Sequence, residues 1–138
     1  MKKALTGVVV AGAFLAGAGT ALAAPWRDLP KLQTPGVALE NGHYRFNSAE
    51  RNHGSFEWEG DLRDTLPADG NNGYAEVRVE GHTWVRYDGK DRAKVHLHHS
   101  NWDGAQRYTD DADMRVCLDR SFHPDSCTGV VHFHAGQR

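Results

Sequence analysis

Seven segments of this chain alternate between apolar and polar residues with a period of two. This period places every second side chain on the same face of an extended strand, so each segment can bury one face and expose the other. In residues 74–81, for example, Ala75, Val77 and Val79 alternate with charged residues. The other segments are 42–47, 55–62, 82–89, 91–99, 113–119 and 128–135. We therefore expect seven strands.

The sequences between these segments favour short antiparallel connections. The stretches ADGNNG, DGKDR and SNWDGAQ are rich in glycine, asparagine and aspartate, which tolerate turn geometry. No stretch keeps a helical period over three turns. One apolar face per strand predicts an all-β fold, a small antiparallel β-sandwich of about seven strands, with a small barrel as the alternative.

The first 23 residues have the pattern of a secretory signal peptide. Lys2 and Lys3 precede an uncharged apolar run, which ends in the small-residue sequence Ala21-Leu22-Ala23. Charged and proline-rich sequence follows at once, so a membrane span is not predicted. We expect cleavage after Ala23 and hence a secreted, extracellular protein with a single mature domain.

Residues 24–41 differ from the rest of the chain. Three of the five prolines lie here, and each lacks a backbone donor and favours an extended conformation in the residue before it. The sequence predicts an extended arm in front of a β-sandwich domain at 42–138, which docks on a partner by adding a strand or filling a groove. The alternative is a first edge strand with a frayed terminus. The candidate partner-binding residues of the arm are Trp26, Leu29, Leu32, Val37 and Leu39.

Cys117 and Cys127 are the only two cysteines of the chain. An even pair in an exported protein predicts a disulfide, which would close a loop of about eleven residues and contribute roughly 2–4 kcal/mol. A catalytic pair with His123 would need a free thiolate. The spacing of the two cysteines is not one that zinc sites commonly use.

Two pairs of histidines raise the question of a metal site. His96 and His98 share one face of their segment, and His132 and His134 share one face of theirs. If the two strands were neighbours, four imidazoles would converge and could bind zinc or copper. Nearby cations such as Lys94 disfavour a metal, and cross-strand polar pairs are the alternative use of these side chains. We expect no cofactor.

Other features restrict the class of function. The chain carries no G-x-S-x-G elbow, phosphate loop or H-E-x-x-H motif, so we do not expect an enzyme. Its formal net charge is −2 with the two signs interleaved, so we expect no nucleic-acid partner. Trp84 and Trp102 are candidates for an exposed binding surface, because one shares a face with polar residues and the other lies in a loop rich in glycine and aspartate.

The stretch RVCLDRSFHPDSC, from Arg115 to Cys127, pairs a Val-Cys with a Pro-Asp-x-Cys. Together with the signal peptide, the proline-rich arm and a single disulfide-bearing β-domain, it resembles small exported bacterial β-sandwich proteins. Within that group the chain is similar to the adaptor subunit of umbrella toxin particles, which are secreted antibacterial complexes. The resemblance implies that the arm docks on larger secreted subunits, one lectin-like and one toxin-bearing.

The leading hypothesis is a secreted, non-enzymatic module that works by protein–protein contact as an adaptor of an extracellular toxin complex. One alternative is an exported histidine-rich metal-binding protein. Another is an extracellular inhibitor or glycan-binding module.

Overall fold

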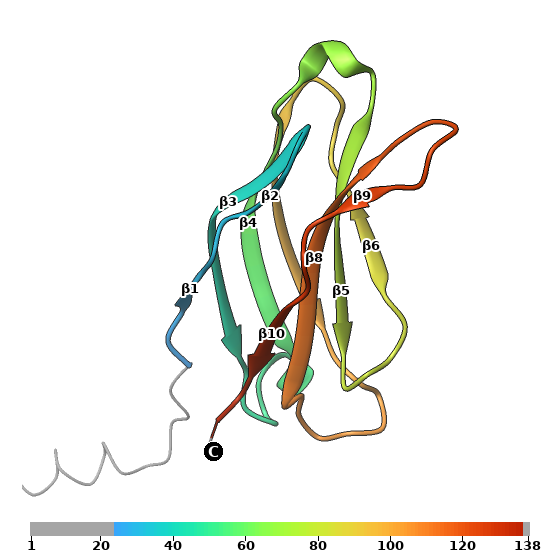
Figure 1. Ribbon diagram of the computed structural model, residues 1–138. Helices are drawn as coiled ribbons and strands as arrows, with labels where there is room; N and C mark the ends of the chain where they lie inside the picture. Colours follow the sequence, from blue (N-terminus) through green and yellow to red (C-terminus); the bar gives the residue numbers. More distant parts are fainter. Residues whose placement is uncertain (1–23, 137–138) are drawn as a thin grey trace, which may run out of the picture.

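The computed structural model describes residues 24–136 and consists of two antiparallel sheets packed face to face (Figure 1). This arrangement confirms the predicted all-β sandwich. The predicted signal peptide, residues 1–23, lies outside the described residues. No helix within residues 24–136 is both long enough and apolar enough to cross a membrane.

Each sheet has five strands. The first sheet has the order β1-β3-β4-β7, with β2 also paired to β3, and the second has the order β10-β8-β5-β6, with β9 also paired to β8. The strands are β1 (Arg27–Leu29), β2 (Leu32–Thr34), β3 (Val37–Phe46), β4 (Phe56–Asp64), β5 (Asn72–Val79), β6 (Val85–Asp88), β7 (Lys94–Asn101), β8 (Asp111–Asp119), β9 (Ser126–Cys127) and β10 (Val131–His134). Two short 3-10 helices, Asn52–Gly54 and Pro67–Asp69, lie before β4 and β5.

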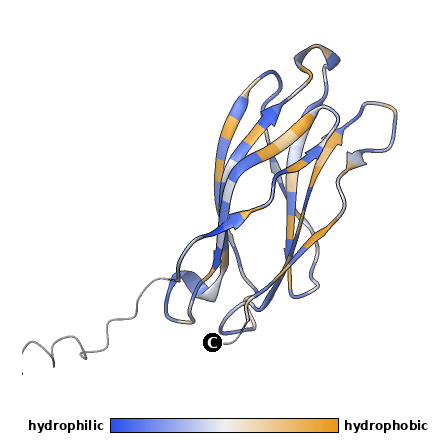
Figure 2. Ribbon diagram, turned by 60° about the vertical axis from the view of Figure 1, so that its left-hand side comes forward, coloured by the Kyte–Doolittle hydropathy of each residue, from blue (hydrophilic) through white to orange (hydrophobic). Residues whose placement is uncertain are grey.

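The core lies between the sheets and is built from the inward-facing side chains of both. Figure 2 shows hydrophobic and hydrophilic residues alternating along the strands. This alternation is expected for a sandwich in which each sheet has one buried face and one solvent-exposed face. Trp58 is completely buried, and its indole nitrogen donates a 3.0 Å hydrogen bond to the side-chain oxygen of Asn101. The largest fully buried apolar side chains are those of Trp58, Phe56, Leu39, Leu62 and Met114.

The interpretation of residues 24–41 as an arm in front of the domain needs correction. The strands β1 and β2 both pair with β3, and β3 itself begins at Val37. Leu32 lies directly opposite Leu39 in this pairing, and both side chains are buried. The segment is therefore an edge of the first sheet, as the alternative interpretation held, and Pro30 separates the two short strands because it has no backbone donor.

A β-bulge explains why the alternation pattern did not reveal the first half of β3. The register between β3 and β4 shifts between Glu40 and His43. Inward-facing residues are odd-numbered before this shift, as at Val37 and Leu39, and even-numbered after it, as at Tyr44. A one-residue insertion reverses the phase of the period-2 pattern, so one continuous strand resembles two unrelated segments in the sequence.

Candidate functional site

The hairpin formed by β8 and β9 projects away from the sandwich (Figure 1). Cys117 and Cys127 face each other across the two strands and form the predicted disulfide. Residues 120–125, which connect the strands, are all exposed. We call residues 117–127 the clasped hairpin.

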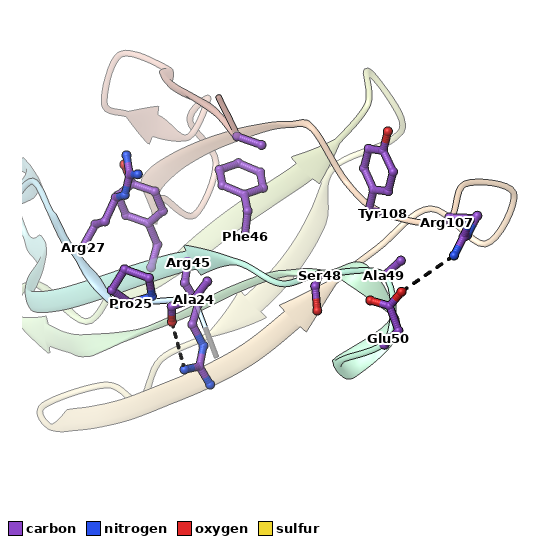
Figure 3. A pocket seen from close by; sticks show the side chains of 12 residues that line it. Ala24, Pro25, Arg27, Arg45, Phe46, Ser48, Ala49, Glu50, Arg107 and Tyr108 are labelled. Carbon is purple, nitrogen blue, oxygen red and sulfur yellow. Dashed lines mark hydrogen bonds and ion pairs between the residues drawn. The ribbon is translucent and has the colours of Figure 1, made fainter. Parts of the chain in front are cut away.

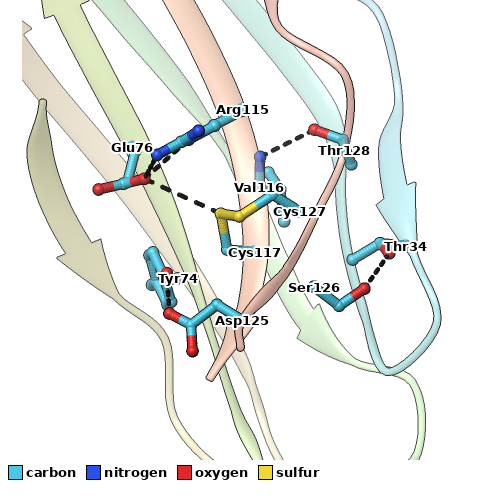
Figure 4. Close-up of a disulfide and its surroundings, with 10 residues drawn as sticks. All are labelled: Thr34, Tyr74, Glu76, Arg115, Val116, Cys117, Asp125, Ser126, Cys127 and Thr128. Carbon is cyan, nitrogen blue, oxygen red and sulfur yellow. Dashed lines mark hydrogen bonds and ion pairs between the residues drawn. A yellow bond between two sulfur atoms is a disulfide. The ribbon is translucent and has the colours of Figure 1, made fainter. Parts of the chain in front are cut away.

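The base of the clasped hairpin is attached to both sheets. The Tyr74 hydroxyl on β5 donates a hydrogen bond to the Asp125 carboxylate, and the Thr34 and Ser126 hydroxyls lie 3.1 Å apart (Figure 4). Burial, together with the neighbouring Asp125 carboxylate, raises the pKa of Tyr74, so the phenol stays protonated and keeps donating. The hairpin is thus held in a defined direction.

Phe122 occupies the tip of the clasped hairpin. Its exposed fraction is 102%, so its ring is in full contact with water. Its backbone has φ of +63°, in the left-handed region that bulky L-residues rarely adopt. The turn is closed by a 3.3 Å hydrogen bond from the His123 amide to the Arg120 carbonyl. This conformation directs a large apolar side chain away from the protein.

The immediate neighbours of Phe122 are polar and basic. The side chains of Arg120 and His123 are exposed, and within residues 24–136 neither makes an ion pair. The tip of the clasped hairpin therefore presents one aromatic ring flanked by a guanidinium and an imidazole.

A second feature is a pocket of about 550 Å³ at an open edge of the sandwich (Figure 3). We call it the edge pocket. Its walls come from the start of the described chain, from β1 and β3, from the segment that follows β3, from the segment before β8 and from the residue after β10. Tyr44, Phe46 and Tyr108 supply its aromatic surface, and Arg27, Arg45 and Arg107 supply its cations.

A buried carboxylate lies on the outer face of the first sheet, behind the edge pocket. Glu57 accepts hydrogen bonds from Arg45 at 2.9 Å and from Asn47 at 3.0 Å, and its other oxygen lies 2.7 Å from His98. Burial alone would raise the pKa of Glu57, but these hydrogen bonds outweigh it and lower the pKa to about 2. The Trp26 ring covers Arg45, with 4.2 Å between the guanidinium carbon and the ring centroid.

The other residues of the predicted arm do not form a free surface. Leu29, Leu32, Val37 and Leu39 are buried in the core of this chain. Trp26 is partly exposed, and its edge contacts the His98 ring at a centroid distance of 5.8 Å. The arm residues expected to contact a partner therefore already contact the sandwich itself.

The two candidate surface tryptophans differ in exposure and in the groups that cover their rings. Trp84 lies on the outer face of the second sheet, beneath the guanidinium groups of Arg78 and Arg115 at 4.4 and 4.5 Å. Trp102 is 44% exposed and stacks on His53 with a centroid distance of 4.2 Å. Trp84 is thus covered by cations, whereas Trp102 keeps one ring face against an imidazole.

The four candidate metal-binding histidines do not converge. His96 and His98 lie on β7 of the first sheet, and His132 and His134 lie on β10 of the second. All four point outward, because the residues between them, Leu97 and Phe133, are core residues. Each imidazole is within 2.9 Å of a carboxylate of a neighbouring strand: Asp61, Glu57, Asp113 and Asp111 in turn. The cross-strand polar pairs considered as the alternative are therefore present.

Comparison with protein-family models, with curated proteins and with solved structures found no match to this chain. The candidate sites are therefore inferred only from the positions of their residues in this structure. The sequence predicted the loop closed by Cys117 and Cys127 but did not single out Phe122 within it. An apolar residue among polar ones in a loop closed by a disulfide was the available signal.

Proposed function

We propose that this chain is an exported, non-catalytic β-sandwich that binds a partner protein through Phe122 at the tip of the clasped hairpin. The single observation that carries the proposal is the complete exposure of a phenylalanine in a left-handed backbone conformation. Isolated exposed apolar side chains are common on protein surfaces. A fully exposed phenylalanine that has an unfavourable φ and lies on a tethered hairpin is uncommon.

The conformation of Phe122 has a cost that nothing within the sandwich offsets. A left-handed conformation costs roughly 1–2 kcal/mol for a residue with a Cβ atom, and the exposed ring gains no burial in return. A glycine or asparagine would fit this turn better. Outliers of this kind are concentrated at binding and switch regions, where the cost is offset by the interaction that they make.

The attachment of the hairpin suits a recognition element. Binding is weakened by the entropy lost when a flexible loop becomes ordered, so a loop that is rigid beforehand binds more tightly. Here the Cys117–Cys127 disulfide and the Tyr74–Asp125 hydrogen bond limit that loss. An aromatic anchor on a rigid support has the properties of an interface hot spot.

The residues beside Phe122 in the sequence define the chemistry of the partner. Arg120 and His123 are both exposed, and the Arg120 guanidinium complements carboxylates. We therefore propose a partner with an apolar pocket rimmed by acidic residues. In line with the resemblance to toxin-complex adaptors, the first partners to test are larger secreted subunits of the lectin-like and toxin-bearing kinds.

This proposal keeps protein–protein contact as the function but moves it away from the N-terminal residues expected to carry it. Leu29, Leu32, Val37 and Leu39 would have to leave the core to dock elsewhere, which would expose four apolar side chains at a large cost in stability. The clasped hairpin needs no such rearrangement.

Affinity capture from the culture medium of the source, followed by mass spectrometry, tests the proposal. The wild-type chain is compared with Phe122→Ser and with Leu66→Ser, which alters another exposed apolar side chain, 50% exposed, in a different loop. We expect one protein to be retained by the wild type and by Leu66→Ser and to be lost with Phe122→Ser, at an unchanged melting temperature. Equal capture by all three chains would contradict a role for Phe122.

A further inference from the structure

We propose that the edge pocket is a binding site for a small amphipathic anion, a carboxylate attached to an apolar or aromatic body. The site is separate from the clasped hairpin and does not depend on the proposed function. Three properties of the pocket support it: an aromatic floor continuous with the core, an excess of cations, and a size suited to a small molecule.

The floor of the edge pocket is the open end of an aromatic cluster. Tyr44 and Phe46 are only partly buried, whereas the two rings behind them, Phe56 and Phe133, are buried. The ring centroids are 4.5 Å apart for Tyr44 and Phe133, and 5.1 Å apart for Phe46 and Phe56. The apolar interior of the sandwich therefore reaches the solvent here, and an apolar ligand body would complete its burial.

The charges that line the edge pocket favour an anion. The residues that line the edge pocket include three arginines, Arg27, Arg45 and Arg107, and one acid, Glu50. Glu50 lies 3.8 Å from Arg107, and both side chains are largely exposed, which leaves this pair weak. The positive charge of Arg45 is compensated by the Glu57 carboxylate, 2.9 Å away. Arg27 has no ion-pair partner among residues 24–136, so its guanidinium is free to bind a carboxylate through two parallel hydrogen bonds.

The arrangement of these groups sets the orientation of the ligand. Figure 3 shows Arg27 and Arg107 at opposite ends of the edge pocket, with Phe46 between them. A ligand whose carboxylate meets Arg27 would lay its body across Tyr44 and Phe46. A volume of about 550 Å³ lies within the range of roughly 300–1,000 Å³ that is usual for small-molecule pockets.

Nuclear magnetic resonance titration tests this inference with 4-phenylbutyrate as the probe and the uncharged 4-phenylbutan-1-ol as its matched analogue. The chain is expressed with its own N-terminal leader and labelled with nitrogen-15. We expect saturable shifts of the amide signals of residues 44–50, 107 and 108. We also expect the alcohol to bind about tenfold more weakly, because one charge-assisted contact contributes about that factor.

Three variants make the test specific. Arg27→Gln should weaken the binding of phenylbutyrate about tenfold and leave that of the alcohol unchanged, since it removes only the charge-assisted contact. Ala49→Trp should abolish both, since it fills the edge pocket. Arg92→Gln, at an exposed arginine in the connection between β6 and β7, should change neither. The inference would be overturned if the wild type showed no saturable shifts, or if Arg27→Gln bound phenylbutyrate as tightly as the wild type.

Discussion

Cys117 of β8 lies directly opposite Cys127 of β9, with 4.0 Å between their Cα atoms, and the disulfide between them closes the hairpin that carries Phe122. The bridge therefore joins two strands that are already paired. Its position ties the exposed tip to the buried part of β8, where Val116 and Leu118 are core residues. The same bond can contribute both to stability and to the direction of the tip.

Replacing both cysteines by serine is expected to lower the free energy of unfolding by about 2–4 kcal/mol, because the unfolded chain loses a cross-link over a short loop. Denaturant unfolding of the wild type and the double variant gives this difference. Reduction of the wild type should reproduce it. An unchanged midpoint would mean that the pairing of β8 and β9 alone holds the hairpin.

Leu32→Ala is expected to lower the free energy of unfolding by about 2–5 kcal/mol, because Leu32 fills a buried position opposite Leu39. The control is Gln33→Ala, at an exposed position of the same short strand, which should change stability by less than about 0.5 kcal/mol. Denaturant unfolding compares the two. A value near zero for Leu32→Ala would restore the interpretation of residues 24–41 as a separate arm.

Glu57 is expected to stabilise the fold in a pH-dependent manner. Its pKa is lowered to about 2, so the folded state favours the ionised carboxylate. The resulting stability is fully present above the ordinary pKa of about 4.5 and is lost as the pH falls from there towards 2. Denaturant unfolding between pH 7 and pH 2.5 should show Glu57→Gln to be less stable at neutral pH, with the gap narrowing in acid. A gap that is constant across this range would contradict the ion pair.

His132 is expected to titrate above its usual range. The Asp113 carboxylate, 2.7 Å away, stabilises the imidazolium and raises the pKa of His132 above 6.5. The pair therefore contributes stability below pH 6.5, which is lost as the pH rises through the raised value. Imidazole proton shifts followed by nuclear magnetic resonance give this pKa directly. Asp113→Asn should return it towards 6.5, and no change on that substitution would refute the coupling.

The sequence allowed most of the fold to be predicted, because burial of one face per strand produces the period of two along each segment. It did not decide between an arm and an edge strand for residues 24–41, since three-residue strands such as Leu32–Thr34 are too short to show alternation. It also missed the continuity of β3, because the bulge after Glu40 reverses the phase of the pattern. The sequence also did not show which strands share a sheet. Nothing in it indicated that β7 and β10, which carry the paired histidines, belong to different sheets.

The candidate sites were harder to predict than the fold. A disulfide was predicted from two cysteines in a chain expected to be exported, but the exposure of Phe122 depends on its left-handed backbone, which a single sequence does not reveal. The edge pocket joins Arg27 to Arg107 across eighty residues of sequence, and only the pairing of the strands brings them to one opening.

Photochemical cross-linking at position 122 is a direct test of the proposed docking role of Phe122. The photoreactive residue p-benzoylphenylalanine is introduced at position 122 or, as a control, at position 66, and each chain is irradiated in the culture medium of the source. We predict one cross-linked partner protein from position 122 and none from position 66. A lack of cross-linking at position 122, or the same products from both positions, would contradict the proposal that the clasped hairpin is the docking element.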